Sequence, residues 1–595
     1  MQALLAGLPV LVLLFGFFLF ATGVFLLSQL LFARLLAQPA EQGSQAARFL
    51  LGLFLFCGFC NAILLIPALL EAMLGLDGPA ALAIHRAGLA ILALAVIAIA
   101  LAGGLGLAAA GRWRRFFPAS PAARSALFCF AVAVGAYLFN GLRADFVYDT
   151  GLYHFPFVNH VKTFGLEIGL ANLHTRFAYY NLQQFGQVAL QLFSPRPDFA
   201  VPSLNLLFLA ALLIAAEEAI RQAHAQARAQ PSPGLLAVIS FWVLAFAFGT
   251  PTSGSLLSFD ADYALSVAAA IVIYHCVAAS FSGFLGKDIL LLLVCLPLLK
   301  LAGVVPILLV SLFALLLGLL KLCRQGGPAF GPLLTARLAA WTAPPRKAAC
   351  LLCACLYLLM LSTNLTLSGY LIYPQPQTGP IGAQAVPRAY VQYEKDITIT
   401  SWARSNTDVD PNHRQALLPA RAWIPAFLRT GRGKTLSLWI ASGALVSAAA
   451  GAALLARLGR HSARQQGLES LLALAAATTL VALVILVAFP PDPRFYAWMR
   501  SLTFFLWVDL LLLLPIAGAL LLSGLAALIS AFSIGTLSTL PQAKVSLKES
   551  SSTSLFPSWR SRARGQAGGL PIRIPSPTDQ CWAAEPPCSA HSPRY

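Results

Sequence analysis

The sequence predicts an all-α polytopic membrane protein with about thirteen transmembrane helices, or roughly twelve to fourteen. Hydrophobic residues make up 58% of the 595 residues and charged residues only 10%. Soluble globular proteins carry about 25% charged residues. The hydrophobic residues also gather in runs near the length of about 20 at which a helix crosses a bilayer. This composition excludes soluble enzymes, solenoids and disordered scaffolds.

The predicted spans form three groups, in residues 1–141, 200–366 and 436–533, separated by two long polar segments. The candidate spans are 5–31, 48–72, 79–108, 123–141, 200–219, 234–250, 263–283, 288–300, 303–320, 348–366, 436–456, 467–488 and 502–533. Residues 1–32 contain no Lys or Arg and so lack the basic region of a cleaved signal peptide. We therefore expect the first run to be a span that enters from outside.

The chain has a net charge of +18, and the positions of its Lys and Arg residues indicate the orientation of these spans. In a soluble chain this net charge would suggest nucleic acid, but membrane proteins gather Lys and Arg in short cytoplasmic connectors. Alternate connectors here are basic, such as the Arg112-Trp113-Arg114-Arg115 cluster. This pattern places residues 142–199 and 367–435 outside and residues 534–595 inside. The last segment is rich in Ser, Pro and Gly and reads as a disordered cytoplasmic tail. No nucleic-acid partner is expected.

The first external segment, 142–199, concentrates residues that can bind or activate a substrate. A carboxylate can serve as a base or a metal ligand, and aromatic faces can stack on sugar rings. Asp145 and Asp149 are four residues apart, which puts both on one face if the segment is helical. The alternative is an amphipathic surface helix whose charges are solvated. The candidates are Asp145, Asp149, Tyr153, His154, His174 and Arg176.

Several blocks of this chain resemble a family of multi-pass bacterial membrane proteins that is similar to the GT-C glycosyltransferases. The blocks are DFVYDTGLYH, GLANLHTRFAYYN, SGYLIYP, ITSWAR and PPDPRFYAW, which start at positions 145, 169, 368, 399 and 490. GT-C enzymes take a sugar from a polyprenyl-phosphate carrier on the outer face of the membrane. The resemblance implies a bacterial inner (plasma) membrane protein with an extracytoplasmic active site.

The same resemblance implies a catalytic role for an acid in the first large external loop. Asp149 matches that position, with Asp145 as a second candidate. Many GT-C proteins have an adjacent acidic pair, and this chain departs from that pattern. A joint role for the two carboxylates therefore depends on whether the stretch is helical.

Further candidates lie at predicted span boundaries. Asp260 and Asp262 lie in a short connector that is predicted to be external. They are either substrate ligands or solvated loop residues. Lys300 interrupts an apolar run, and a cation at membrane depth usually faces a partner or a cavity, unless it snorkels to the interface. Arg494 lies two residues after Asp492. Either the Asp492 carboxylate neutralises the Arg494 guanidinium, or the guanidinium is available to bind a phosphate. Arg404 belongs to the cationic second external segment, residues 367–435.

Two functions fit these residues. The first is an integral membrane glycosyltransferase that moves a sugar from a polyprenyl-phosphate donor to an extracytoplasmic glycan or lipid acceptor. In it, Asp149 activates the acceptor hydroxyl and the cations bind the lipid phosphate. A divalent cation on Asp145, Asp149 or Asp260 is an open alternative. The second function is a transporter or flippase of a lipid-linked polysaccharide, and a polymerase is a close variant of the first.

Overall fold

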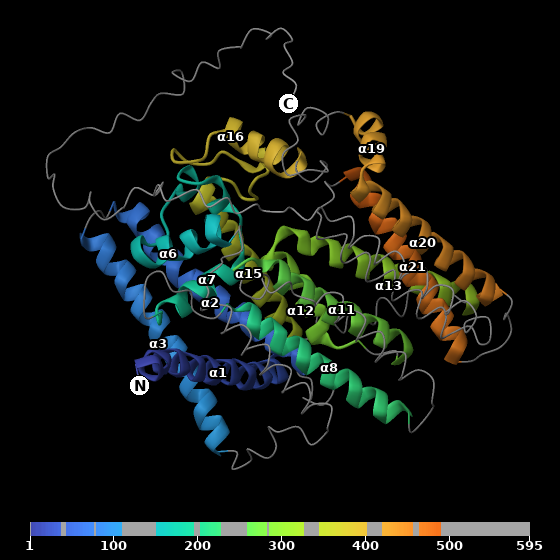
Figure 1. Cartoon of the computed structure of the whole chain (residues 1–595), viewed down its shortest axis with the longest axis horizontal. Helices are drawn as coiled ribbons and strands as arrows, with labels where there is room; N and C mark the ends of the chain where they lie inside the picture. Colours follow the sequence, from blue (N-terminus) through green and yellow to red (C-terminus); the bar gives the residue numbers. More distant parts are fainter. Residues whose placement is uncertain are drawn as a thin grey trace, which may run out of the picture. The chain divides into compact units, whose positions relative to one another are not determined.

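The structure, a computed structural model, describes residues 2–36, 43–75, 79–109, 150–194, 203–227, 259–282, 285–325, 344–401, 419–455 and 463–488. By its internal contacts the chain divides into two units, Met1–Leu525 and Ala526–Tyr595. Every described residue belongs to the first unit. The described residues form helices joined by turns and contain no strand (Figure 1).

Seven of the described helices are long and apolar enough to cross a membrane. The chain is therefore an all-α polytopic membrane protein, as the sequence predicts. The apolar stretches are Phe15–Leu35, Gln45–Leu74, Pro79–Gly106, Ala261–Ala279, Leu301–Leu320, Lys347–Ser368 and Leu436–Leu454. The helices that contain them are α1 (Gln2–Leu35), α2 (Gln45–Leu74), α3 (Pro79–Ala109), α11 (Ala261–Ser282), α13 (Val304–Gln325), α15 (Pro344–Ser368) and α20 (Gly431–Leu455).

Three other predicted spans coincide with helices outside that group of seven. They are α8 (Asn205–Ala227), α12 (Lys287–Leu299) and α21 (Ala463–Ala488). The predicted spans 123–141, 234–250 and 502–533 lie outside the described residues, as does the predicted tail. The number of about thirteen spans therefore stays a prediction.

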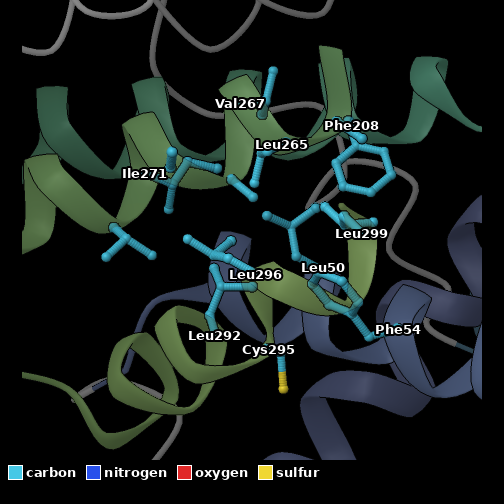
Figure 2. Close-up of a cluster of buried hydrophobic side chains, with 14 of the residues drawn as sticks. Leu50, Phe54, Phe208, Leu265, Val267, Ile271, Leu292, Cys295, Leu296 and Leu299 are labelled. Carbon is cyan, nitrogen blue, oxygen red and sulfur yellow. The ribbon is translucent and has the colours of Figure 1, made fainter. Parts of the chain in front are cut away.

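The best-buried part of the core lies where α2, α8, α11 and α12 meet (Figure 2). Leu50 of α2, Ile271 of α11 and Leu296 of α12 are fully buried there. Alanine is frequent along α11, and small side chains let neighbouring membrane helices approach closely. This close packing fixes the ends of α11 and α12, which carry charged residues.

Helix α12 is the short member of this group. Its 13 residues span about 20 Å, less than the roughly 30 Å of a bilayer core. A 3-10 turn at Leu301–Gly303 follows it and leads into α13. Lys300 therefore lies at a break between two helices, where the sequence places an interrupted apolar run.

The two predicted external segments pack against each other. The Asn172 side chain of the first segment donates to the Gln384 carbonyl of the second over 2.8 Å, and the Gly169 backbone N–H donates to the Thr366 carbonyl near the end of α15 over 2.8 Å. A small separate core joins the segments and consists of Ala171, Ala178, Tyr370, Tyr373, Val386 and Val391. The contact agrees with the prediction that both segments lie on the same side of the membrane.

Helices α1 and α3 cross at glycines. A Cβ atom at Gly103 would lie 2.1 Å from the Leu19 carbonyl oxygen, and one at Gly23 would lie 1.9 Å from the Ile99 carbonyl oxygen. The obstructing atoms belong to the backbone, so they cannot move as a side-chain end can. Neighbouring Gly104 differs, because its added Cβ would meet only the end of the Leu19 side chain at 3.9 Å.

These distances predict opposite outcomes for two adjacent substitutions. Gly103→Ala forces α1 and α3 apart and should lower the free energy of unfolding by about 1–3 kcal/mol. Gly104→Ala, the matched control, should leave it nearly unchanged. Thermal unfolding of the two variants in the same detergent measures the difference. Equal midpoints for both variants would show that the helices do not cross at Gly103.

Candidate functional site

Two pairs of polar side chains meet where α12 ends and α11 begins. The Lys300 ammonium, just beyond the last residue of α12, donates to Asp262 Oδ1 over 2.6 Å. Asp262 lies in the first turn of α11. Both side chains are only partly buried, with 32% and 21% exposure. Lys300 therefore has a carboxylate partner within the fold, Asp262, and its predicted role as a substrate contact stays a prediction.

The second pair joins His154 to Asp260. His154 ends the π-helical turn η2 (Thr150–His154), and its Nε2 atom lies 3.9 Å from Asp260 Oδ1. The Gln184 amide nitrogen contacts the other ring nitrogen, Nδ1. When Gln184 donates to Nδ1, the ring proton lies on Nε2 and faces Asp260.

Asp260 links the two pairs. The Asp262 backbone N–H donates to Asp260 Oδ1 over 3.3 Å, so the two carboxylates are held in one turn. His154, Asp260, Asp262 and Lys300 thus form one group, the Lys300 cluster. The alternative of two separately solvated loop aspartates is wrong for these residues, because each carboxylate has a partner within the fold.

Buried amides support this cluster from α7 (Leu182–Gln191). Gln183 donates to Asn205 Oδ1 over 2.9 Å, and Asn205 donates to the Asp260 carbonyl over 3.2 Å. All ten residues of α7 are buried, including four glutamines. Sequence reasoning missed these amides. Their only signal is the polar repeat in LQQFGQVALQ, in which glutamines recur on one helical face.

Tyr153, His174 and Arg176 form a half-buried group beside His154. The Arg176 guanidinium carbon lies 5.1 Å from the centre of the Tyr153 ring, in a cation–π contact. The His174 ring stacks on the same tyrosine with ring centres 6.3 Å apart, and the His154 ring lies 4.2 Å from it. The Arg176 guanidinium therefore covers a face of the Tyr153 ring, and the sequence suggested such aromatic faces for stacking on a sugar.

The charge of this group is set by its surroundings. Burial lowers the pKa of the His174 imidazole, Arg176 lowers it further, and Glu394 acts in the opposite direction. His174 is consequently neutral near pH 7, and Arg176 supplies the positive charge of the group. The cation of the group is therefore permanent, because a guanidinium does not lose its proton in a protein.

Glu394 anchors the turn that carries His174 and Arg176. Its buried carboxylate accepts hydrogen bonds from Thr175 over 3.2 Å and from the Tyr179 hydroxyl over 2.8 Å. Burial raises the pKa of the Tyr179 phenol, and the Glu394 charge raises it further. Sequence reasoning did not single out Glu394. Nothing in the sequence links it to a turn more than 200 positions away.

Four predicted site residues, Asp145, Asp149, Arg404 and Arg494, lie outside the described residues. Asp149 immediately precedes Thr150, where the described turn η2 begins. Within the described ranges no group of three or more His, Cys, Asp and Glu side chains is arranged to hold a metal ion. Asp260 and Asp262 alone do not supply a divalent-cation site, since Lys300 already neutralises Asp262.

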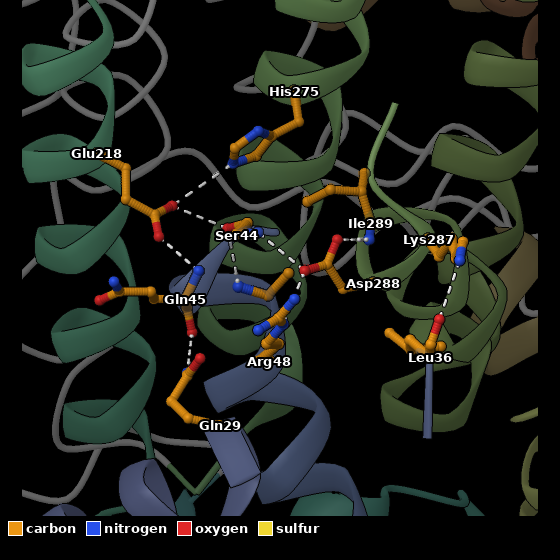
Figure 3. Close-up of polar contacts among 11 residues, drawn as sticks. Gln29, Leu36, Ser44, Gln45, Arg48, Glu218, His275, Lys287, Asp288 and Ile289 are labelled. Carbon is orange, nitrogen blue, oxygen red and sulfur yellow. Dashed lines mark hydrogen bonds and ion pairs between the residues drawn. The ribbon is translucent and has the colours of Figure 1, made fainter. Parts of the chain in front are cut away.

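A second polar group joins side chains of α2, α8, α11 and α12 (Figure 3). The Arg48 side chain donates to Asp288 Oδ2 over 3.2 Å, and both side chains are completely buried. Asp288 also accepts the Ser44 backbone N–H over 2.8 Å. We call Ser44, Arg48, Glu218, His275 and Asp288 the Arg48 cluster. Sequence reasoning treated cations near span ends as orientation signals and did not foresee this pair.

Glu218 completes the Arg48 cluster by binding the first residues of α2. Its carboxylate accepts the Ser44 hydroxyl over 2.9 Å and the Gln45 backbone N–H, and His275 Nε2 lies 3.8 Å away. A helix N-terminus favours negative charge and has unpaired N–H groups. The carboxylates of Glu218 and Asp288 satisfy both needs for α2.

Along α11 and α12 the two clusters lie closer together than the thickness of a bilayer core. Asp262 and His275 are thirteen positions apart on α11, which corresponds to about 20 Å along its axis. Asp288 and Lys300 flank α12 and give about 18 Å. The hydrocarbon core is about 30 Å thick, so the clusters cannot lie at its two surfaces. Charges at that depth persist when they have partners, as these do.

Comparison with known proteins gives one match. A family described as "Domain of unknown function (DUF8201)" matches residues 80–325, less than half of the chain. The matched region includes the whole Lys300 cluster. No curated protein and no solved structure matches the chain.

The buried Arg48–Asp288 pair predicts an asymmetry between single and double substitutions. Arg48→Met leaves the Asp288 charge buried without its cation, which should cost about 3–5 kcal/mol of unfolding free energy. Arg48→Met combined with Asp288→Asn removes both charges and keeps an acceptor for the Ser44 N–H, so it should recover much of that loss. Denaturant unfolding in detergent measures both, with Arg86→Met on the exposed side of α3 as control. An equal loss in the single and double variants would contradict the pairing.

Proposed function

We propose that the protein is an integral membrane glycosyltransferase that moves a sugar from a polyprenyl-phosphate donor to an extracytoplasmic glycan or lipid acceptor. The observation that carries the proposal is the Lys300 cluster. It combines a cation, two carboxylates and an imidazole at a break between α12 and α13. The segment that brings His154 to the cluster begins one residue after Asp149. The sequence blocks that resemble GT-C enzymes include that segment.

Lys300 is the proposed contact for the donor phosphate. The lipid tail of a polyprenyl phosphate lies in the bilayer, so its phosphate meets the protein near the membrane boundary. A lysine at a helix break within an apolar bundle can meet it there. Before the donor binds, Asp262 neutralises Lys300. The donor phosphate therefore competes with the Asp262 carboxylate for the same ammonium group.

The charge balance calls for further cations. The Lys300 cluster contains one ammonium group and two carboxylates, so its four residues together carry a net negative charge when His154 is neutral. An additional phosphate would be repelled unless another positive group joined it. Arg176 supplies a positive charge near His154, because its guanidinium lies over the Tyr153 ring and that ring lies against the His154 ring. Arg404 and Arg494 are the proposed additional partners, and a divalent cation held with Asp145 or Asp149 is the alternative to them.

Asp149 is the proposed base, with Asp145 in a supporting role. The acceptor hydroxyl gives its proton to the Asp149 carboxylate, and the hydroxyl oxygen attacks the anomeric carbon of the donor sugar. The bond between that carbon and the phosphate oxygen breaks, and its electron pair leaves with the lipid phosphate. Lys300 and the arginines stabilise the charge that develops on this leaving group. Tyr153, His154, His174 and Arg176 would border the sugar.

The proposed setting is the bacterial inner membrane with the cluster toward the extracytoplasmic side. The alternation of basic connectors supports this orientation, as does the contact between the two long polar segments. A transporter or flippase of a lipid-linked polysaccharide is the second candidate. The break between α12 and α13 favours it, because interrupted helices are typical of transporter binding sites.

A direct assay separates the two functions. The purified protein in liposomes receives labelled polyprenyl-phosphate sugars and an acceptor, and the released lipid phosphate is measured. Asp149→Asn should reduce sugar transfer by about 100-fold or more, because a positioned base contributes about that factor. Glu167→Gln is the matched control, since Glu167 is a half-exposed acid of the same segment that pairs with His160. Lipid translocation without sugar cleavage would support the transporter instead.

A second measurement tests the competition at Lys300. Lys300→Met should raise the KM for the donor by about ten- to a hundredfold, the worth of a charged hydrogen bond. Asp262→Asn removes the competing carboxylate and should lower the donor KM or leave it unchanged. A purely structural ion pair would instead destabilise the protein equally in both variants and leave KM alone. An unchanged KM in Lys300→Met would remove Lys300 from the donor site.

A further inference from the structure

Helix α19 (Ala420–Arg429) presents two different faces. Trp423 and Phe427 are buried on one face, with their ring centres 6.0 Å apart, and they pack into the main hydrophobic core. Arg421 and Arg429 are exposed on the other face. Because the apolar face is covered by the protein itself, α19 is not free to insert into lipid. Its arginines point away from the core that holds it.

The connection to α20 fixes α19 at the membrane boundary. Thr430 alone separates the two helices, and its hydroxyl accepts the Gly433 backbone N–H over 3.1 Å. The membrane-spanning stretch of α20 begins at Leu436, two residues after exposed Lys434. Two residues of helix correspond to about 3 Å, so Lys434 lies at the level where lipid head groups begin. In Figure 1, α19 lies at the start of α20.

The charge of this region has one sign. Residues 419–455 contain no Asp or Glu, and they contain Arg421, Arg429, Arg432 and Lys434. Buried Arg48 and partly buried Lys300 each have a carboxylate partner, whereas Arg421, Arg429 and Lys434 have none within the described ranges. An exposed cationic face beside a membrane span is complementary to a surface of phosphate groups.

We propose that Arg421, Arg429 and Lys434, the α19 surface, bind the phosphodiester head groups of acidic phospholipids in the adjacent leaflet. Guanidinium groups suit this ligand because they bind phosphate oxygens through two parallel hydrogen bonds. Trp423 and Phe427 hold the helix in place, so the cations are presented without ordering a flexible segment. This binding is independent of the proposed sugar transfer.

The test uses the full-length protein in neutral detergent. Phosphatidylglycerol and phosphatidylcholine are titrated separately, and bound lipid is counted by native mass spectrometry alongside the thermal unfolding midpoint. Each cation near a membrane surface contributes about a fivefold factor in affinity. Arg421→Gln with Arg429→Gln should therefore weaken phosphatidylglycerol binding by roughly tenfold or more. Arg421→Lys with Arg429→Lys keeps the charge and should retain most of the binding.

A control variant removes an exposed arginine that lies outside the candidate spans, Arg388→Gln, and should bind phosphatidylglycerol like the wild type. An unchanged midpoint in phosphatidylcholine shows that each variant is folded. Equal phosphatidylglycerol affinity in the wild type and the Arg421→Gln, Arg429→Gln variant would overturn the proposal. So would equal binding of phosphatidylcholine by the wild type. Competition by millimolar inorganic phosphate would assign the cations to free phosphate and also overturn it.

Discussion

The length of α12 is the constraint on which the rest of the described site depends. A helix of 13 residues cannot cross a bilayer, yet α12 has a charged residue at each end. Asp288 lies in its first turn and Lys300 follows its last, and both signs suit the helix dipole. The dipole alone is too weak to hold charges at this depth, so each also needs a counter-ion. Arg48 of α2 and Asp262 of α11 provide them. The two ion pairs therefore fix α12 against both neighbouring helices.

Much of the fold was predictable because its signals are local. Apolar runs of about 20 residues are visible along the chain, and most of those within the described ranges coincide with helices. Lys300 stood out for the same reason, as a cation inside an apolar run. Asp262 could be named as a candidate site residue, but not as the partner of Lys300. Asp262 is 38 positions away, and the hairpin of α11 and α12 brings them together.

The parts that could not be predicted depend on contacts distant in sequence. Arg48 followed the rule for cytoplasmic cations and so gave no sign that Asp288, 240 positions later, neutralises it. The α7 glutamines occupy positions that would be solvated on a surface helix. They are buried because α2, α3 and α6 (Phe155–Phe164) pack around α7. Burial converts each amide from a solvated group into one that requires a partner, and those partners lead to Asp260.

The cations of this chain differ in how deeply they are buried, and composition alone does not show this difference. A buried cation must be neutralised within the protein, and Arg48 therefore serves the packing of α2 against α12. Lys300 is intermediate, since about a third of its side chain is exposed while Asp262 holds it. An exchange of Asp262 for an external anion needs little rearrangement there, whereas the same exchange at Arg48 would require opening the core. The partial exposure of the Lys300–Asp262 pair is what makes Lys300, and not Arg48, suited to bind a ligand.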